Sequence, residues 1–136
     1  MRVLVTCSWI TAACALLIAL WTAPQLLATG VVGVGGSPLF EVLYLFPALI
    51  GVPVCLLAAA VAATLLVRGV VTTTARRLLA WGQILTVTLL ALCVAALATP
   101  RATGWELALM PGALQVGQVV VAAGLILLVR DGRRGG

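Results

Sequence analysis

The stretch that decides the fold is residues 40–67, FEVLYLFPALIGVPVCLLAAAVAATLLV, whose only charged side chain is Glu41 at its beginning. A helix rises about 1.5 Å per residue, so roughly 20 apolar residues cross the hydrocarbon core of a bilayer. This run is longer than that. Pro47 and Pro53 are expected to bend it, because each removes a backbone hydrogen bond. The stretch therefore predicts a tilted or bent transmembrane helix.

Three further apolar runs of similar length accompany this one. They are residues 3–23, 78–99 and 105–129. Pro24 and Pro100 follow the first and second of these runs and are expected to end their helices. Consecutive spans must cross a bilayer in opposite directions. The sequence therefore predicts an all-α polytopic membrane protein, with four transmembrane helices in two antiparallel hairpins that form a single transmembrane domain over residues 1–136.

The composition also predicts a protein that is dissolved in lipid. Hydrophobic residues make up 64% of the chain and charged residues 8%, with a mean hydropathy of +1.29. Soluble domains contain about 45–50% apolar and about 25% charged residues. A soluble domain of this size could not bury so much apolar surface, so the first expected partner is the lipid bilayer.

The arginines predict the orientation in the membrane. With the N-terminus in the cytoplasm, Arg101 alone lies outside, and the other seven arginines lie on the cytoplasmic side. This is the distribution that the positive-inside rule requires. We therefore expect a multi-pass protein of the plasma membrane with both termini in the cytoplasm. The use of Arg without Lys, together with abundant Ala, Val, Leu and Gly, is typical of a GC-rich bacterial genome.

The first run has an alternative interpretation as a signal peptide, since Arg2 precedes an apolar segment. That segment is longer than the usual apolar region of about 7–15 residues, and no Ala-x-Ala cleavage site follows it. A lipoprotein interpretation of Cys14 fails because apolar residues continue well past it. We expect a retained helix; cleavage would leave three helices and an external N-terminus.

Two acids, Glu41 and Glu106, are expected near the outer surface. One interpretation is a pair of carboxylates that collects cations or protons at a pore mouth. The other is structural, because Ser37 and Thr103 stand where N-caps are expected and a carboxylate near a helix start is favoured by the helix dipole. Capping is the stronger prediction, and the ion site remains the alternative.

The amides of Gln115 and Gln118 are expected near the middle of the bilayer. They are three residues apart, so they share one face of a helix. An amide at that depth avoids lipid and seeks a partner helix, where Gln83, Thr86 and Thr88 are candidates. We expect interhelical hydrogen bonds; the alternative is a polar site for a small ligand.

Small residues recur along the predicted helices at intervals of about four, which allows close backbone approach. The candidates for helix packing are Ala15, Ala19, Gly51, Ala59, Gly117 and Gly124. The plain interpretation is packing within the bundle. A stripe that is left over would face another subunit.

The two hairpins also resemble each other weakly. Glu41 and Glu106 each follow an aromatic residue at a predicted helix start, and Pro47 and Pro111 follow each acid. Duplication of an ancestral hairpin would explain the match. Common rules for membrane interfaces, with aromatics at boundaries and Pro near helix starts, would be enough to produce it alone, and they are the favoured explanation.

The residue inventory argues against several chemical functions. The chain has no His, no Lys and three acids, so general acid–base catalysis has few agents and we expect no enzyme. The four cysteines form no Cys-x-x-Cys, and no metal site or cofactor is predicted. The net charge of +5 comes from arginines between apolar runs, without an aromatic-interleaved stripe, so nucleic acid is not an expected partner.

The leading functional hypothesis is therefore a non-enzymatic accessory or interaction subunit, or a homo-oligomer, that packs against another membrane protein or itself. The alternative is a small transporter or channel that uses Glu41, Glu106, Gln115 and Gln118. Size and helix number are similar to those of small multidrug transporters, but the Glu deep in the first helix that marks that family is missing here.

Overall fold

The computed structural model describes residues 1–30, 37–99 and 105–134, without the side chains of residues 105–109 and 134. Its elements are α1 (Arg2–Thr29), α2 (Pro38–Phe40), a π-helical turn η1 (Glu41–Leu45), α3 (Phe46–Val67), α4 (Thr74–Leu97) and α5 (Trp105–Arg134). Within those ranges there is no strand. Four helices are long and apolar enough to cross a membrane. The all-α prediction with four membrane-length helices is confirmed.

The first helix continues through Pro24 to Thr29, so the predicted end at residue 23 is wrong. Pro24 lacks the N–H that would bond to the carbonyl one turn back, so the helix loses one backbone hydrogen bond there. A helix that ended at Pro24 within lipid would instead leave several backbone groups without partners. Loss of one bond costs less than loss of the helix. The helix ends at Gly30, whose positive φ of 70° lets its N–H donate to the carbonyl of Leu26.

The second membrane helix begins at Pro38, two residues before the predicted start at residue 40. Ser37 is its N-cap, as predicted, and the Ser37 hydroxyl accepts a bond from the N–H of Phe40 at 3.3 Å. It then widens into η1, where the N–H of Phe46 bonds to the carbonyl of Glu41, five residues back. Pro47 follows directly. A proline ring collides with the carbonyl four residues earlier, and the wider turn moves that carbonyl away. The helix therefore passes the proline without ending.

The third and fourth membrane helices are also displaced from their predicted bounds. α4 begins at Thr74 instead of residue 78, and α5 runs to Arg134 instead of residue 129. Arg76 and Arg77, which were expected in a loop, therefore lie in the first turn of α4. Apolar runs mark the hydrocarbon span, whereas a helix extends further where long arginine side chains reach the polar interface.

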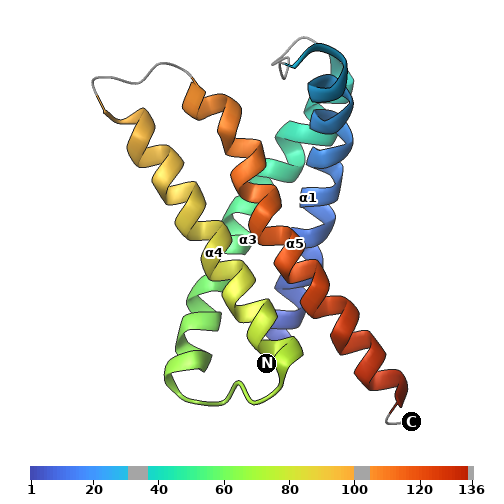
Figure 1. Cartoon of the computed structure of the whole chain (residues 1–136), viewed down its shortest axis with the longest axis vertical. Coiled ribbons are helices and arrows are strands. Elements are labelled where there is room, and N and C mark those ends of the chain that lie inside the picture. The colour runs from blue at the N-terminus through green and yellow to red at the C-terminus, as the bar shows by residue number, and fades with distance from the viewer. Residues whose placement is uncertain (31–36, 100–104, 135–136) are drawn as a thin grey trace.

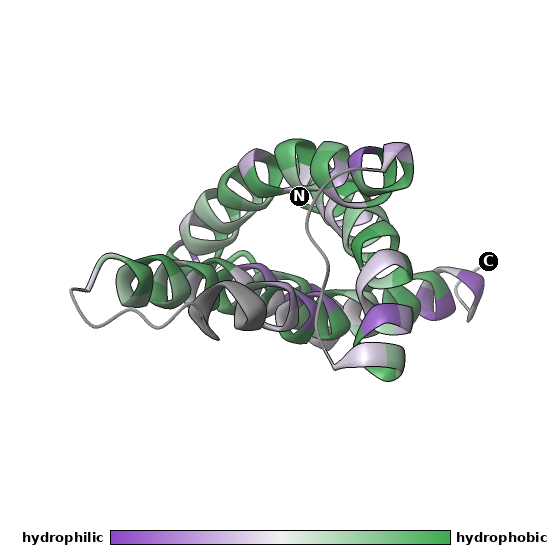
Figure 2. Ribbon diagram, turned by 90° about the horizontal axis from the view of Figure 1, so that it is seen from above, coloured by the Kyte–Doolittle hydropathy of each residue, from purple (hydrophilic) through white to green (hydrophobic). Residues whose placement is uncertain are grey.

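The four long helices form two pairs, α1 with α3 and α4 with α5, and the two pairs cross each other (Figure 1). α1 packs along α3, and α4 packs most extensively against α5; α3 also contacts α4, and α1 contacts α5. Within each pair the chain direction reverses. The C-terminal part of α4 diverges from α1 and α3 in Figure 1. Hydrophobic residues dominate the ribbons of all four helices, and hydrophilic residues stand out near the C-terminus (Figure 2).

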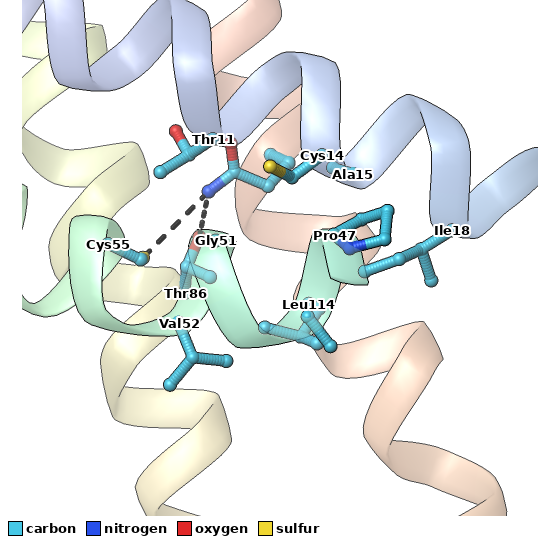
Figure 3. A pocket seen from close by; sticks show the side chains of 12 residues that line it. Thr11, Cys14, Ala15, Ile18, Pro47, Gly51, Val52, Cys55, Thr86 and Leu114 are labelled. Atoms are coloured by element: carbon cyan, nitrogen blue, oxygen red, sulfur yellow. Dashed lines mark hydrogen bonds between the residues drawn. The ribbon is translucent and has the colours of Figure 1, made fainter. Parts of the chain in front are cut away.

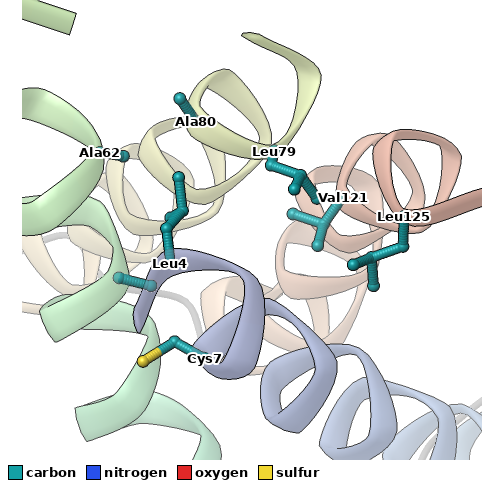
Figure 4. Packing of buried hydrophobic residues seen from close by; sticks show 8 residues of the cluster. Leu4, Cys7, Ala62, Leu79, Ala80, Val121 and Leu125 are labelled. Atoms are coloured by element: carbon teal, nitrogen blue, oxygen red, sulfur yellow. The ribbon is translucent and has the colours of Figure 1, made fainter. Parts of the chain in front are cut away.

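A cluster of buried apolar residues joins the four helices toward the end where α1 and α4 begin (Figure 4). Leu4 of α1, Leu79 of α4 and Val121 of α5 are fully buried in it, as is Ala62 of α3. α1 therefore contributes side chains to the same core as α3, α4 and α5.

The crossing of α4 and α5 depends on glycine. A Cβ on Gly117 would lie 2.7 Å from the backbone nitrogen of Thr86, and one on Gly82 would lie 2.9 Å from that of Val121. Gly124 meets α4 at a similar distance further along. Small residues allow membrane helices to approach until their backbones touch. Gly117 and Gly124 thus lie in contact within the bundle, and Gly82 is an additional close contact that the sequence analysis did not single out.

The remaining packing candidates lie around α1 and α3. A Cβ on Gly51 would be 3.0 Å from the Cβ of Cys14, so this glycine brings the two helices together. Ala15 is buried, while Ala19 and Ala59 are half-buried. The predicted small-residue stripes of these helices are therefore turned toward the inside of the bundle.

Candidate functional site

The polar residues inside the bundle gather around Gln83 of α4, which is fully buried. Its amide nitrogen donates to the hydroxyls of Ser8 at 3.2 Å and Thr11 at 2.8 Å, both on α1. Its carbonyl oxygen accepts from the thiol of Cys55 on α3 at 3.2 Å. One amide thus binds two other helices at once, which a polar group in a lipid-embedded core must do to avoid an unsatisfied donor or acceptor.

Gln118 of α5 brings the fourth helix into this network. Its amide nitrogen lies 3.5 Å from the Gln83 carbonyl oxygen and donates to the Thr86 hydroxyl at 3.2 Å. Its own carbonyl oxygen, Oε1, is buried and has no hydrogen-bond partner. Buried acceptors are rarely left without partners. The described network therefore uses all the Gln118 donors and retains one unused acceptor.

A small cavity of about 30 Å³ lies beside Gln118, between α1, α3 and the α4–α5 crossing. Figure 3 shows Thr11 and Cys14 on α1 facing Gly51 and Cys55 on α3, with dashed hydrogen bonds that end on Cys55 and Thr86. One water needs roughly 10–15 Å³ by this measure, whereas sites for small organic molecules are about 300–1,000 Å³. The cavity therefore has room for one or two waters and no larger ligand.

Gln115 and Thr88 do not join the network. The Gln115 amide donates to the backbone carbonyl of Ala15 on α1 at 2.9 Å. Thr88 is exposed, and its hydroxyl bonds to the carbonyl of Ile84 in its own helix. The expected interhelical bonds to α4 are therefore present for Gln118, with both Gln83 and Thr86, whereas Gln115 bonds to a different helix.

Glu41 and Glu106, the two acids expected near the outer surface, are not seen to enter the interior of the bundle in the described part of the chain. Glu41 is exposed at the start of η1. The side chain of Glu106 lies outside the described residues, as does the predicted N-cap Thr103. The backbone at the two helix starts also differs, because α5 is regular helix at Glu106 where the earlier helix has its π-turn. The hairpin resemblance does not extend to that turn.

The four cysteines are all unbridged. Among the described residues, no three side chains of His, Cys, Asp or Glu come together as a metal site would require. Cys55 acts instead as a weak hydrogen-bond donor to Gln83, and Cys14 packs against Gly51. The arrangement offers a structural polar centre with no nucleophile–base pair in it.

Sequence reasoning missed Ser8 and Cys55 as members of the network. Ser8 is fully buried and stands three residues before Thr11, the same spacing that singled out Gln115 and Gln118. Polar residues three apart within an apolar run were thus a usable signal for the first helix as well. Cys55 carried no comparable signal, since a lone Cys behaves as a small apolar residue.

Comparison of the chain with protein-family models, curated proteins and solved structures finds no match.

Proposed function

We propose that this chain is a non-enzymatic membrane subunit that binds another membrane protein, or a second copy of itself, through the C-terminal half of α4. One observation carries the proposal: small residues on that half form an exposed stripe. Its members are Thr88, Ala91 and Ala95, with Ala98 at the C-cap of the helix. They follow one another at intervals of three or four, so they share one helix face.

The packing glycines Gly117 and Gly124 are turned inward, whereas this stripe is exposed along its whole length. On α4 it lies where the helix diverges from α1 and α3 (Figure 1). Larger side chains flank it, with Leu92 60% and Val94 51% exposed. A face of this kind, with small residues between larger apolar ones, lets a second helix approach closely in lipid, where dispersion contacts drive association.

The interior supports a binding role over a transport role. The buried amides of Gln83 and Gln118 bond to one another and to neighbouring hydroxyls, and the adjoining cavity is about 30 Å³. A conduction or transport path needs polar groups that face an accessible space. Groups that already bond across four helices serve to hold those helices together.

Bulky substitutions on α4 test this proposal. Ala91→Leu with Ala95→Leu should disrupt a complex that is extracted from native membranes in mild detergent and resolved by native electrophoresis or mass photometry. Ala60→Leu with Ala63→Leu, on the exposed face of α3, is the matched control and should leave the complex intact. The mass of the complex, measured against the 13.9 kDa chain, distinguishes a homo-oligomer from a hetero-complex. A native protein that runs as a monomer and binds nothing would overturn the proposal.

The second candidate function is a small transporter or channel, which the unpaired carbonyl oxygen of Gln118 beside a cavity favours. Liposomes that contain the purified chain would then conduct protons or small cations. Flux should fall in Glu41→Gln, Glu106→Gln and Gln118→Leu. Flux at the level of empty liposomes, or flux that none of these changes alters, would remove this candidate.

We further infer that the protein resides in a bacterial plasma membrane with both termini in the cytoplasm. The arginine distribution supports this orientation. A reporter that is active only outside the cytoplasm, fused after residue 136, should be silent, and the same reporter inserted after Arg101 should be active.

A further inference from the structure

A second opening in the bundle lies at the end where α1 and α4 begin and α5 approaches its end. It has a volume of about 390 Å³ and is a groove open to the surroundings. Its lining consists of Met1, Arg2, Val5, Thr6, Arg76 and Leu128. Two guanidinium groups from different helices therefore share one groove whose remaining lining is mainly apolar.

The charges at this groove are not balanced by the protein itself. Among the described residues, neither Arg2 nor Arg76 has a carboxylate partner. The first turns of α1 and α4 contain no acidic residue, although a negative charge is favoured there. Further arginines stand at the same end of the bundle, with Asp131 as the acid among them; these arginines are Arg68, Arg77, Arg130 and Arg133. An anion would therefore be attracted to the groove.

The depth of the groove in the membrane indicates which class of anion it would bind. Trp9 and Trp81 are 52% and 59% exposed and stand seven and five residues inward from Arg2 and Arg76. Exposed tryptophans mark the boundary between headgroups and hydrocarbon. The arginines thus lie at headgroup depth, and Val5 and Leu128 line the apolar part. A phosphate with acyl chains attached fits both parts, whereas a free phosphate would use only the arginines.

We propose that this groove binds one anionic phospholipid, whose phosphate contacts Arg2 and Arg76 and whose acyl chain lies along Val5 and Leu128. Basic pockets between transmembrane helices are suited to such headgroups. The site is separate from the exposed face of α4, so neither proposal depends on the other.

Native mass spectrometry of the full chain, released from bicelles that contain phosphatidylglycerol and phosphatidylcholine, tests the site. The native protein should retain one phosphatidylglycerol. Arg2→Gln with Arg76→Gln should weaken its binding about 30-fold, the change expected for two surface arginines. Arg68→Gln with Arg133→Gln removes the same charge at the same end, outside the groove, and should weaken binding far less.

A second variant protects the test against misfolding. Val5→Trp fills the apolar part of the groove and leaves both guanidinium groups in place, and it should also reduce phosphatidylglycerol retention. Circular dichroism checks that each variant stays helical. Equal losses in the two arginine pairs, equal retention of phosphatidylcholine, or displacement of the lipid by inorganic phosphate would each overturn the proposal.

Discussion

Replacement of Gln83 by methionine removes the residue that binds α4 to the other three helices. Methionine is unbranched and has a similar length, so the change tests hydrogen bonding with little change in packing. Gln83 makes bonds of 3.2 and 2.8 Å to Ser8 and Thr11 and accepts bonds of 3.2 and 3.5 Å from Cys55 and Gln118. All four are lost in the variant.

The expected cost follows from these contacts. Interhelical hydrogen bonds in membrane proteins average about 0.6 kcal/mol, so four of them predict a loss of about 2 kcal/mol in the free energy of unfolding. The partners limit the damage. The Thr11 hydroxyl still bonds to the carbonyl of Ser8, and the Gln118 nitrogen still bonds to Thr86. The Cys55 thiol, a weak donor, does lose its acceptor, so the loss should be at least about 2 kcal/mol.

Reversible unfolding of the full chain in mixed micelles of increasing SDS content, followed by tryptophan fluorescence, measures this loss. Thr64→Val is the matched control, because Thr64 is exposed and its hydroxyl bonds only within its own helix, and it should change the free energy of unfolding by less than about 0.5 kcal/mol. A Gln83→Met protein as stable as the native one would refute the view that this network holds the helices together. A loss equal to that of the control would refute it as well.

Three further changes test the packing with the same unfolding assay. Gly117→Ala should lower the free energy of unfolding by about 2 kcal/mol or more, because its Cβ would press on the α4 backbone. Gly112→Ala is the control, since its Cβ meets nothing within 4 Å and the change should be neutral or stabilising. Equal effects of the two changes would contradict the close crossing. Leu4→Ala should lower the free energy of unfolding by about 2 kcal/mol, the lower end of the range for a buried Leu, because the unfolded chain also stays in an apolar environment. Leu16 is 63% exposed, so Leu16→Ala should change it little. Ser37→Ala should lose about 1 kcal/mol through its N-cap, an effect that Ser37→Asp should prevent; no loss would show that the cap is dispensable.

The number and nature of the helices could be predicted from sequence because the bilayer sets a minimum length for each apolar run. The helix ends were less predictable. A proline commonly ends a helix in a soluble protein, but α1 continues through Pro24 to Thr29 because lipid offers the backbone no other hydrogen-bond partner. The charges of Arg76 and Arg77 predict a loop, although helical arginines reach the interface equally well.

The site was predictable only where a polar side chain stood out in an apolar run. Gln118 was expected to find Gln83 and Thr86, and it does. The rotation of each helix could not be predicted, because inward and lipid-facing sides are both apolar and leave no periodic contrast. That ambiguity hid the role of Ser8 and assigned Thr88 to the interior instead of the surface.

The π-turn before Pro47 makes room for the proline ring, and it also sets the rotation of the preceding residues about the helix axis. Each residue of a helix advances the chain by about 100°, so one surplus residue in η1 rotates everything before it by that angle relative to α3. With this rotation, the ring centroid of Phe40 lies 5.7 Å from that of Trp21 of α1 and 5.2 Å from that of Tyr44. A one-residue deletion within Glu41–Leu45 would turn Phe40 away from Trp21, whereas point substitutions there would preserve the alignment. The length of this turn, more than its composition, sets how the second membrane helix meets the first.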